Sequence, residues 1–511
     1  MNRGPNVLTR QTGFMGGISD DNRAVRLFRG TFLATQFIIT KHFDIFSNPG
    51  KLTPYRDSAL DTNDGSTSTG MKQYFVRDFL YPTGSGKLYG LGQNASGKTK
   101  IVEKADATTG NWDLPANSEG SDPVQNGCFV EYKNYAWGFQ GINKIWKWGF
   151  LNGTPSITNS IGTAGASITS VAQGLVGTDD NLYLPYNNFI SRITSNGTYN
   201  DAVLTLPTNF KITSLTNYGN YMAIACAPVA AFNGVSKVFL WDFSSPDVQT
   251  VIDWGEGILS VLETIEGMLV GVTDRYLNNT AGAGRGSFIV QTYSGGTPQV
   301  VKEIFTQAIV GKNMPLSKAV KNNRLFFTAK VMTNTAGTTY NEGIWSFGRK
   351  SSSYPFTLSL DLIDENVNTS GIQSFGTAAN FFFIAHSADG SIDKTSSTAT
   401  YTFTSVFESQ IINLADSTND KQLHSVKATF SELQSGQQLV LKYKVDDTAA
   451  TAWTTTGTFS TVGALSHSFY NEEANSSTVF KSGSEYKFRL ESTGGLEITG
   501  LQVLLSSYFS V

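Results

Sequence analysis

The stretch GNYMAIA, residues 219–225, joins a short turn of Gly and Asn to a tight run of apolar residues, and this combination recurs along the chain. Gly and Asn adopt the positive φ angles of tight turns, and a short apolar run after such a turn is typical of a buried strand. The other copies are GKLYGLG at Leu88, KNYAWGF at Ala136, DNLYLPY at Leu182, EGMLVGV at Leu269, NRLFFTA at Phe326 and ANFFFIA at Phe382. We interpret the chain as an array of seven similar units, because successive copies lie 40 to 57 residues apart.

Two further apolar segments accompany each copy. One precedes it, as in CFVEY at 128–132, and the other follows it, with centres at Ile101, Trp146, Ile190, Leu240, Ile289, Trp345 and Thr402. Small sheets of three or four strands that bury their faces only against their neighbours are the blades of a β-propeller. The sequence therefore predicts a β-propeller of about seven blades over residues 43–404. The alternatives are a long β-sandwich, a β-helix, for which this repeat is too long, or a different number of blades.

Residues at both ends of this array suggest how the ring closes and packs. We expect the segment FDIFSNPGKLTPYR, residues 43–56, to lie where the ring starts, to add a strand to the last blade and so to remove two open sheet edges. Trp146, Trp148, Trp241 and Trp345 lie in the repeated strands, so we expect them in the packing between blades. The alternative is a platform on which a ligand stacks.

From about Ser405 the pattern changes to strict alternation of apolar and polar residues. The alternating apolar positions are Val426, Ala428 and Phe430; Leu439, Leu441, Tyr443 and Val445; Tyr486, Phe488 and Leu490; and Leu496, Ile498, Leu501, Val503 and Leu505. Period-two alternation is typical of strands with one buried and one wet face. The sequence therefore predicts a C-terminal β-sandwich over residues 405–511, and an all-β fold: a seven-bladed β-propeller followed by a β-sandwich domain.

Charge is sparse and unevenly distributed. Charged residues make up 15% of the chain and the formal net charge is −3, which argues against specific nucleic-acid binding. Residues 1–56 carry eight Lys or Arg against three Asp, so we expect residues 1–42 to form an N-terminal basic arm. This arm is either a solvated surface segment or a segment that docks on an acidic neighbouring subunit. No apolar run is long enough for membrane insertion, and the start MNRGPNVLTR lacks a signal peptide, so we expect synthesis in a cytoplasm.

The cysteines and histidines of the sequence are not spaced as they are in metal sites or disulfides. Cys128 and Cys226 lie in apolar strand-like runs, which favours buried free thiols over a disulfide. The four histidines, at 42, 386, 424 and 467, show no metal-ligand spacing. We therefore predict no metal site and no cofactor.

Some propellers cleave glycosides, so the carboxylates need separate attention. Glycoside cleavage needs two carboxylates across one bond, and the sequence offers isolated candidates: Asp179, Asp180, Glu256, Glu263 and Asp274. The fragment SADGSID at 387–393 lacks the spacing and the Trp of a sialidase repeat. Turn caps and solvated loops are the favoured interpretation of these carboxylates, and we predict that the chain is not an enzyme, with no catalytic residues.

Four stretches resemble structural proteins of tailed bacteriophages that pair a propeller-like region with a terminal β-sandwich. They are FSNPGKLTPYR at 46–56, FESQIINL at 407–414, the run from LVLKYKVDD to AWTTTGTFS at 439–460, and EITGLQVLLSSY at 497–508. The resemblance implies a structural component of the virion tail, at a nozzle, hub or fibre-attachment position, assembled in the host cytoplasm. Its expected partners are other phage tail proteins and copies of itself in a homo-oligomer. The alternatives are a receptor-binding tail protein that binds host surface glycan and, less favoured, a propeller enzyme that cleaves it.

Overall fold

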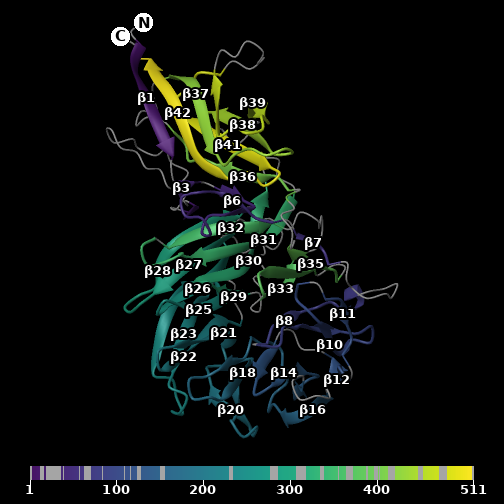
Figure 1. Ribbon diagram of the computed structural model, residues 1–511. Coiled ribbons are helices and arrows are strands. Elements are labelled where there is room, and N and C mark those ends of the chain that lie inside the picture. The colour runs from purple at the N-terminus through teal and green to yellow at the C-terminus, as the bar shows by residue number, and fades with distance from the viewer. Residues whose placement is uncertain are drawn as a thin grey trace.

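The computed structural model of the chain contains two β-rich parts stacked end to end (Figure 1). It describes residues 3–11, 17–18, 36–37, 39–56, 58–61, 71–82, 84–108, 110–115, 117–123, 128–149, 156–229, 234–276, 286–306, 318–333, 339–354, 356–363, 372–386, 390–395, 401, 403–412, 420–446, 453–470 and 480–508. The helical element in these ranges is one 3₁₀ turn, η1 (Met71–Tyr74). No helix in the described part of the chain is long and apolar enough to cross a membrane.

The larger part is a β-propeller, which confirms the predicted fold class. Seven antiparallel sheets follow one another along the chain, consistent with the number of repeats in the sequence. The first four are β8 (Asp78–Leu80), β9 (Leu88–Gln93), β10 (Lys98–Lys104), β11 (Trp112–Asp113) and β12 (Glu119–Pro123); β13 (Val130–Tyr132), β14 (Tyr135–Gln140), β15 (Lys144–Gly149) and β16 (Ser156–Thr163); β17 (Leu175–Val176), β18 (Leu182–Tyr186), β19 (Phe189–Ile193) and β20 (Tyr199–Thr205); and β21 (Phe210–Tyr218), β22 (Tyr221–Pro228), β23 (Val235–Trp241) and β24 (Thr250–Glu256).

The other three sheets complete the series. They are β25 (Ile258–Ile265), β26 (Met268–Tyr276), β27 (Gly286–Tyr293) and β28 (Gln299–Thr306); β29 (Lys318–Lys321), β30 (Arg324–Thr333), β31 (Thr339–Gly348) and β32 (Thr357–Ile363); and β33 (Ile372–Ala378), β34 (Phe381–His386), β35 (Ile392–Thr395) and β7 (Ser58–Leu60). We call these sheets blades one to seven. Every copy of the repeated turn-and-strand element forms the second strand of its blade.

Ring closure differs in detail from the expectation. Strand β7, from the N-terminal region, pairs antiparallel with β35 and is the outer strand of blade seven. The closing strand therefore follows segment 43–56 and does not lie within it. The predicted third strand of the seventh repeat at Thr402 is wrong, because β35 occupies that place, and residue 402 itself lies outside the described residues. The sequence spacing failed here because this blade takes its last strand from a distant part of the chain.

The smaller part consists of two sheets that pack face to face. One has the order β1 (Arg3–Gln11), β42 (Ile498–Tyr508), β37 (Lys421–Phe430) and β40 (Ser466–Tyr470). The other has the order β39 (Thr454–Phe459), β38 (Gln438–Val445), β41 (Tyr486–Thr493), β36 (Ser405–Glu408) and β4 (Ile39–Lys41). The alternating apolar residues of β37, β38, β41 and β42 are buried in one cluster between these sheets.

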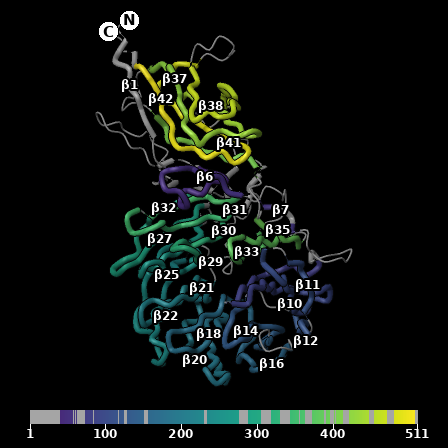
Figure 2. Tube along the Cα trace, in the orientation of Figure 1, coloured from purple at the N-terminus to yellow at the C-terminus, as the bar shows by residue number. Residues whose placement is uncertain are grey.

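The predicted N-terminal arm over residues 1–42 needs correction. Strand β1 pairs with β42, and β4 pairs with β36, so both belong to the sandwich. The basic composition of residues 1–42 suggested a separate arm, but backbone hydrogen bonds hold β1 and β4 at the edges of the two sheets. The short strands β2 (Gly17–Ile18) and β3 (Gln36–Phe37) pair with each other, and the rest of segment 12–38 lies outside the described residues. The propeller is thus inserted between β4 and β36 of the sandwich, as the chain trace shows (Figure 2).

The packing between blades is aromatic, as the repeated tryptophans predicted. Trp146, Trp148, Trp241 and Trp345 are buried to within 2% exposure, each in a cluster of apolar side chains. These indoles therefore belong to the core and do not form a platform for a ligand. Cys128 and Cys226 are buried free thiols, which confirms that prediction.

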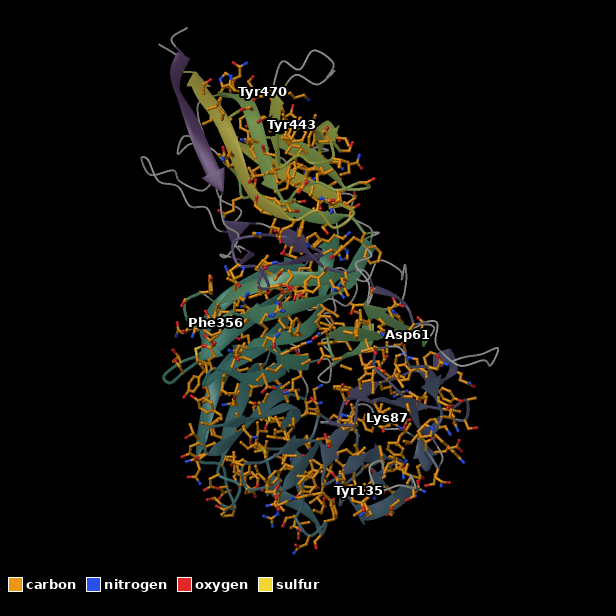
Figure 3. All side chains as sticks on the ribbon, viewed as in Figure 1. Asp61, Lys87, Tyr135, Phe356, Tyr443 and Tyr470 are labelled. Atoms are coloured by element: carbon orange, nitrogen blue, oxygen red, sulfur yellow. The ribbon has the colours of Figure 1, made fainter. Side chains whose placement is uncertain are left out.

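A buried ion pair joins the closing strand to the first blade. The backbone N–H of Asp61 donates to the Ile392 carbonyl of blade seven. The Asp61 carboxylate accepts hydrogen bonds from Lys104 Nζ at 2.8 Å and from Trp112 Nε1 at 2.9 Å, both in blade one. The Lys104 side chain is fully buried, and Figure 3 shows Asp61 at the side of the propeller. Asp61 thus connects the last blade to the first.

We expect Lys104→Met to destabilise the propeller, because it leaves the Asp61 carboxylate buried without its cation. Removing one partner of a buried pair costs about 3–5 kcal/mol. The matched control is Lys87→Met, which removes the Lys87–Glu103 pair of the same blade. That pair is partly exposed, so its loss costs less than about 1 kcal/mol. Urea unfolding of both variants measures the difference, and equal unfolding free energies would contradict the role given to Asp61.

Candidate functional site

The candidate carboxylates from the sequence lie on three different blades. Asp179 and Asp180 are in the turn before β18, where Asp179 accepts a hydrogen bond from the Tyr183 hydroxyl at 2.6 Å and Asp180 pairs with Lys133 at 2.6 Å. Glu256, at the end of β24, pairs with Arg275 at 3.4 Å. Asp274 is buried in β26. The turn position of Asp179 and Asp180 fits the interpretation as turn caps and solvated loops, whereas Asp274 is buried within a strand and does not fit it.

Glu263 has a different position, in the innermost strand of blade five. Lys318, from the innermost strand of blade six, lies 3.1 Å from Glu263 and donates to the carbonyls of Leu215 and Leu262. It also donates to Ser214 Oγ at 3.0 Å. One ammonium group therefore joins the inner strands of blades four, five and six, and the Glu263 carboxylate neutralises it.

The four histidines and the fragment SADGSID do not come together as a metal or sugar site in the described residues. Residues 387–389 of SADGSID lie outside the described residues. His42 and His386 are buried, His424 contacts Ser506, and His467 stacks on Phe459. Within the described ranges no three His, Cys, Asp or Glu side chains come close enough to hold a metal ion.

The chemically richest region that the sequence did not indicate is the joint between propeller and sandwich. A hairpin of β5 (Phe43–Asp44) and β6 (Thr53–Pro54) fills this joint. On the sandwich side, the backbones of Leu52 and Ile498 exchange hydrogen bonds of 2.9 and 3.1 Å. Lys51 and Thr53 bind the Glu497 carboxylate at 2.7 and 2.9 Å. The hairpin is therefore hydrogen-bonded to the sandwich by main chain and side chains.

On the propeller side, the same hairpin meets a buried polar network in blade six. Arg324 Nη1 lies 3.3 Å from Asp44 and 3.9 Å from Asp361. The Tyr55 hydroxyl donates to Asp361 at 3.1 Å, and the Arg324 guanidinium lies over the Phe46 ring. Buried charges of this kind persist only when they are paired and hydrogen-bonded.

The surroundings of Asp361 in the joint shift the pKa of its carboxyl group. Burial raises the pKa of Asp361 to about 7, although Arg324 acts in the opposite direction and Asp44 adds to the rise. Burial also raises the pKa of Tyr55, helped by the charges of Asp361 and Asp44. A strongly shifted carboxyl is a frequent mark of an active site. Here its partners are protein groups from two parts of the fold, so a structural role accounts for it.

The apolar core is continuous across the joint. Phe43 and Leu52 of the hairpin belong to one buried cluster that includes Trp345 of the propeller and Phe430 of the sandwich. A shallow hollow beside the hairpin is lined by Ile45, Phe46, Pro49, Arg349, Lys350, Tyr354 and Thr357. Its two cations have protein partners, because Arg349 Nε binds Glu266 at 2.8 Å and Lys350 donates to the Ser47 carbonyl. The joint is thus a packed connection.

We expect the contribution of Asp361 to the unfolding free energy to fall as the pH rises. Because the Asp361 pKa is higher in the folded chain than in the unfolded one, the folded state binds more protons in the window between the two values. The unfolding free energy then decreases by up to about 1.4 kcal/mol per pH unit between about pH 4 and about pH 7 and is constant above. Asp361→Asn removes this slope.

The measurement is the difference in unfolding free energy between the parent chain and Asp361→Asn across this pH window. Asp253→Asn is the control, because Asp253 is an exposed carboxylate paired with Lys237. A parent-minus-variant difference that is independent of pH would show that folding leaves the Asp361 pKa unchanged, and one that grows as pH rises would show that folding lowers it. Either result would contradict the prediction.

No model of a known protein family matches the chain, and no curated protein matches it. Among solved structures it is similar to the Dos1 propeller (13% identity, 66% of this chain and 94% of that chain, TM-score 0.40) and to the Pan2 WD40 domain of Neurospora crassa (9%, 67% and 95%, TM-score 0.40). It is also similar to an exo-β-1,3-galactanase from Phanerochaete chrysosporium (11%, 88% and 100%, TM-score 0.32). At these identities and TM-scores the likeness gives no indication of what this chain binds.

Proposed function

We propose that this chain is a structural subunit of a tailed-bacteriophage virion, located in the tail, and not an enzyme. The observation that carries this proposal is the joint. A propeller and a sandwich that share one buried cluster and one buried ion network form a stiff body suited to permanent assembly. Domains that must move against each other usually meet through small polar interfaces.

The stretches that resemble phage proteins support the proposal by their positions. Residues 46–56 form most of the joint hairpin and hydrogen-bond to residues 497–508 through Leu52 and Ile498. The other two stretches include half of β36, all but the first residue of β38, and β39, which lie in the same five-stranded sheet. The resemblance therefore concerns the sandwich and its connection to the propeller.

One edge of the sandwich has the character of a contact surface. Strands β39 and β40 are the last strands of their two sheets, on neighbouring edges. Val462, Leu465 and Tyr470, in and beside them, are 61%, 63% and 56% exposed, and Figure 3 shows Tyr470 near the distal end of the sandwich. Open strand edges with apolar side chains tend to pair with other chains. We assign this open edge the contact between copies of the subunit.

The test is the assembly state of the purified full chain by light scattering and electron microscopy. We expect a closed symmetric oligomer that Leu465→Asp dissociates, since the new charge would be buried in the contact. Ile142→Asp is the matched control, because Ile142 is 68% exposed in a turn of blade two.

Three results would contradict the proposal. They are a chain that stays monomeric at high concentration, an oligomer that both variants weaken equally, and polysaccharide cleavage that a single carboxylate substitution abolishes. The last of these would restore the enzyme hypothesis.

A further inference from the structure

The outward face of the five-stranded sandwich sheet concentrates positive charge. Residues 405–511 contain seven Lys or Arg against eleven Asp or Glu, yet four of the seven lie on the side of β38 and β41 away from the core, where Lys444 is itself only 4% exposed. These are Lys442, Lys444, Lys487 and Arg489, and Lys41 joins them from β4. We call these five residues and Trp453 the cationic face.

The strand register places like charges directly opposite each other. Lys442 pairs across the ladder with Arg489, and Lys444 pairs with Lys487. Like charges at directly opposite positions destabilise a sheet, whereas opposite charges stabilise it. Glu408 and Glu491, on the described part of this face, pair with Lys442, Lys487 and Arg489.

The two glutamates also show how this face binds a carboxylate. Arg489 Nε lies 2.9 Å and Lys442 Nζ 2.8 Å from Glu491. Lys487 Nζ lies 3.1 Å from Glu408, and Arg489 Nη1 lies 3.5 Å from it. Asp446, just beyond β38, is held by the backbone N–H groups of Ser484 and Glu485. Burial and the nearby Arg489 lower the pKa of Lys41 to about 8, as expected beside excess positive charge.

An aromatic ring lies among these cations. The Trp453 ring centroid is 5.1 Å from Lys444 Nζ, 5.6 Å from Lys487 Nζ and 5.7 Å from the Arg489 guanidinium carbon. The side chains of Lys442 and Arg489 are 26% and 24% exposed, so they are fixed by packing yet reachable from solvent. Donors that are already ordered lose little entropy when a ligand binds.

We propose that the cationic face binds a carboxylate-bearing polysaccharide, with the indole of Trp453 stacked on a sugar ring and Arg489, Lys442 and Lys487 on its carboxylates. An indole offers a flat apolar surface to the C–H face of a sugar, and guanidinium binds planar carboxylates well. This binding is independent of the assembly contact at the open edge.

The test uses the full chain and calorimetric titration with a short oligogalacturonate. The comparison ligands are a neutral galactose oligomer, poly-glutamate of similar length and a single-stranded DNA. We expect the oligogalacturonate to bind at least about tenfold more tightly than each of them. Trp453→Ala and Arg489→Gln should each weaken its binding about tenfold or more.

The matched control is Lys427→Gln, which removes one positive charge from β37 in the opposite sheet. It should leave binding unchanged. Thermal melting checks that each variant is folded, and Lys442→Gln replaces Arg489→Gln if the latter unfolds. Equal affinity for all polyanions, no affinity for oligogalacturonate, or equal weakening by Lys427→Gln would overturn the proposal. Tight binding of poly-glutamate alone would assign the face to an acidic protein instead.

Discussion

The architecture depends on a short N-terminal segment that pairs with distant parts of the chain in both domains. Between residues 39 and 61 the chain contributes β4 to the sandwich, the β5–β6 hairpin to the joint and β7 to the last blade. Each contribution satisfies strand edges or buried groups that would otherwise be open. Asp61 then carries the connection into blade one through Lys104. Without this segment the last blade would lose its fourth strand and the five-stranded sandwich sheet its fifth.

Much of the fold follows from the sequence, for a physical reason. The second strand of each blade is buried on both faces, so it appears as a compact apolar run after a turn, as in Leu182–Tyr186. The outer strands are only half buried and carry little apolar signal, as in Ser156–Thr163. The closing strand β7 was missed because three residues far from the last blade have no local pattern.

The chemistry of the molecule was less predictable than its fold. Asp44, Tyr55, Arg324 and Asp361 are scattered along the chain, and only the three-dimensional joint brings them together. The cationic face had a signal in the sequence, since the same alternation that gave the inward residues of β38 and β41 also places Lys442, Lys444, Lys487 and Arg489 outward. Trp453 precedes β39, and nothing in its local sequence links it to those cations.

These features together favour a stiff body with separate surfaces for different contacts. Two carboxylates of the propeller, Glu263 and Asp361, are engaged by another blade and by the segment at the joint. The sandwich carries the open edge at β39 and β40 and the cationic face across β4, β38 and β41. A division of this kind suits a subunit that is held in an assembly by one surface and presents another to solvent.

The most direct test of this account is amide hydrogen exchange at Leu52, Tyr55 and Asp61. These N–H groups donate to Ile498, His42 and Ile392, so they report on the sandwich, the hairpin and the last blade. If residues 39–61 hold both domains together, all three amides exchange only through the opening that also exposes the central strands of both domains. Exchange at Leu52 or Asp61 that is about a hundredfold faster than in those strands would show that the segment opens alone, and would contradict the account.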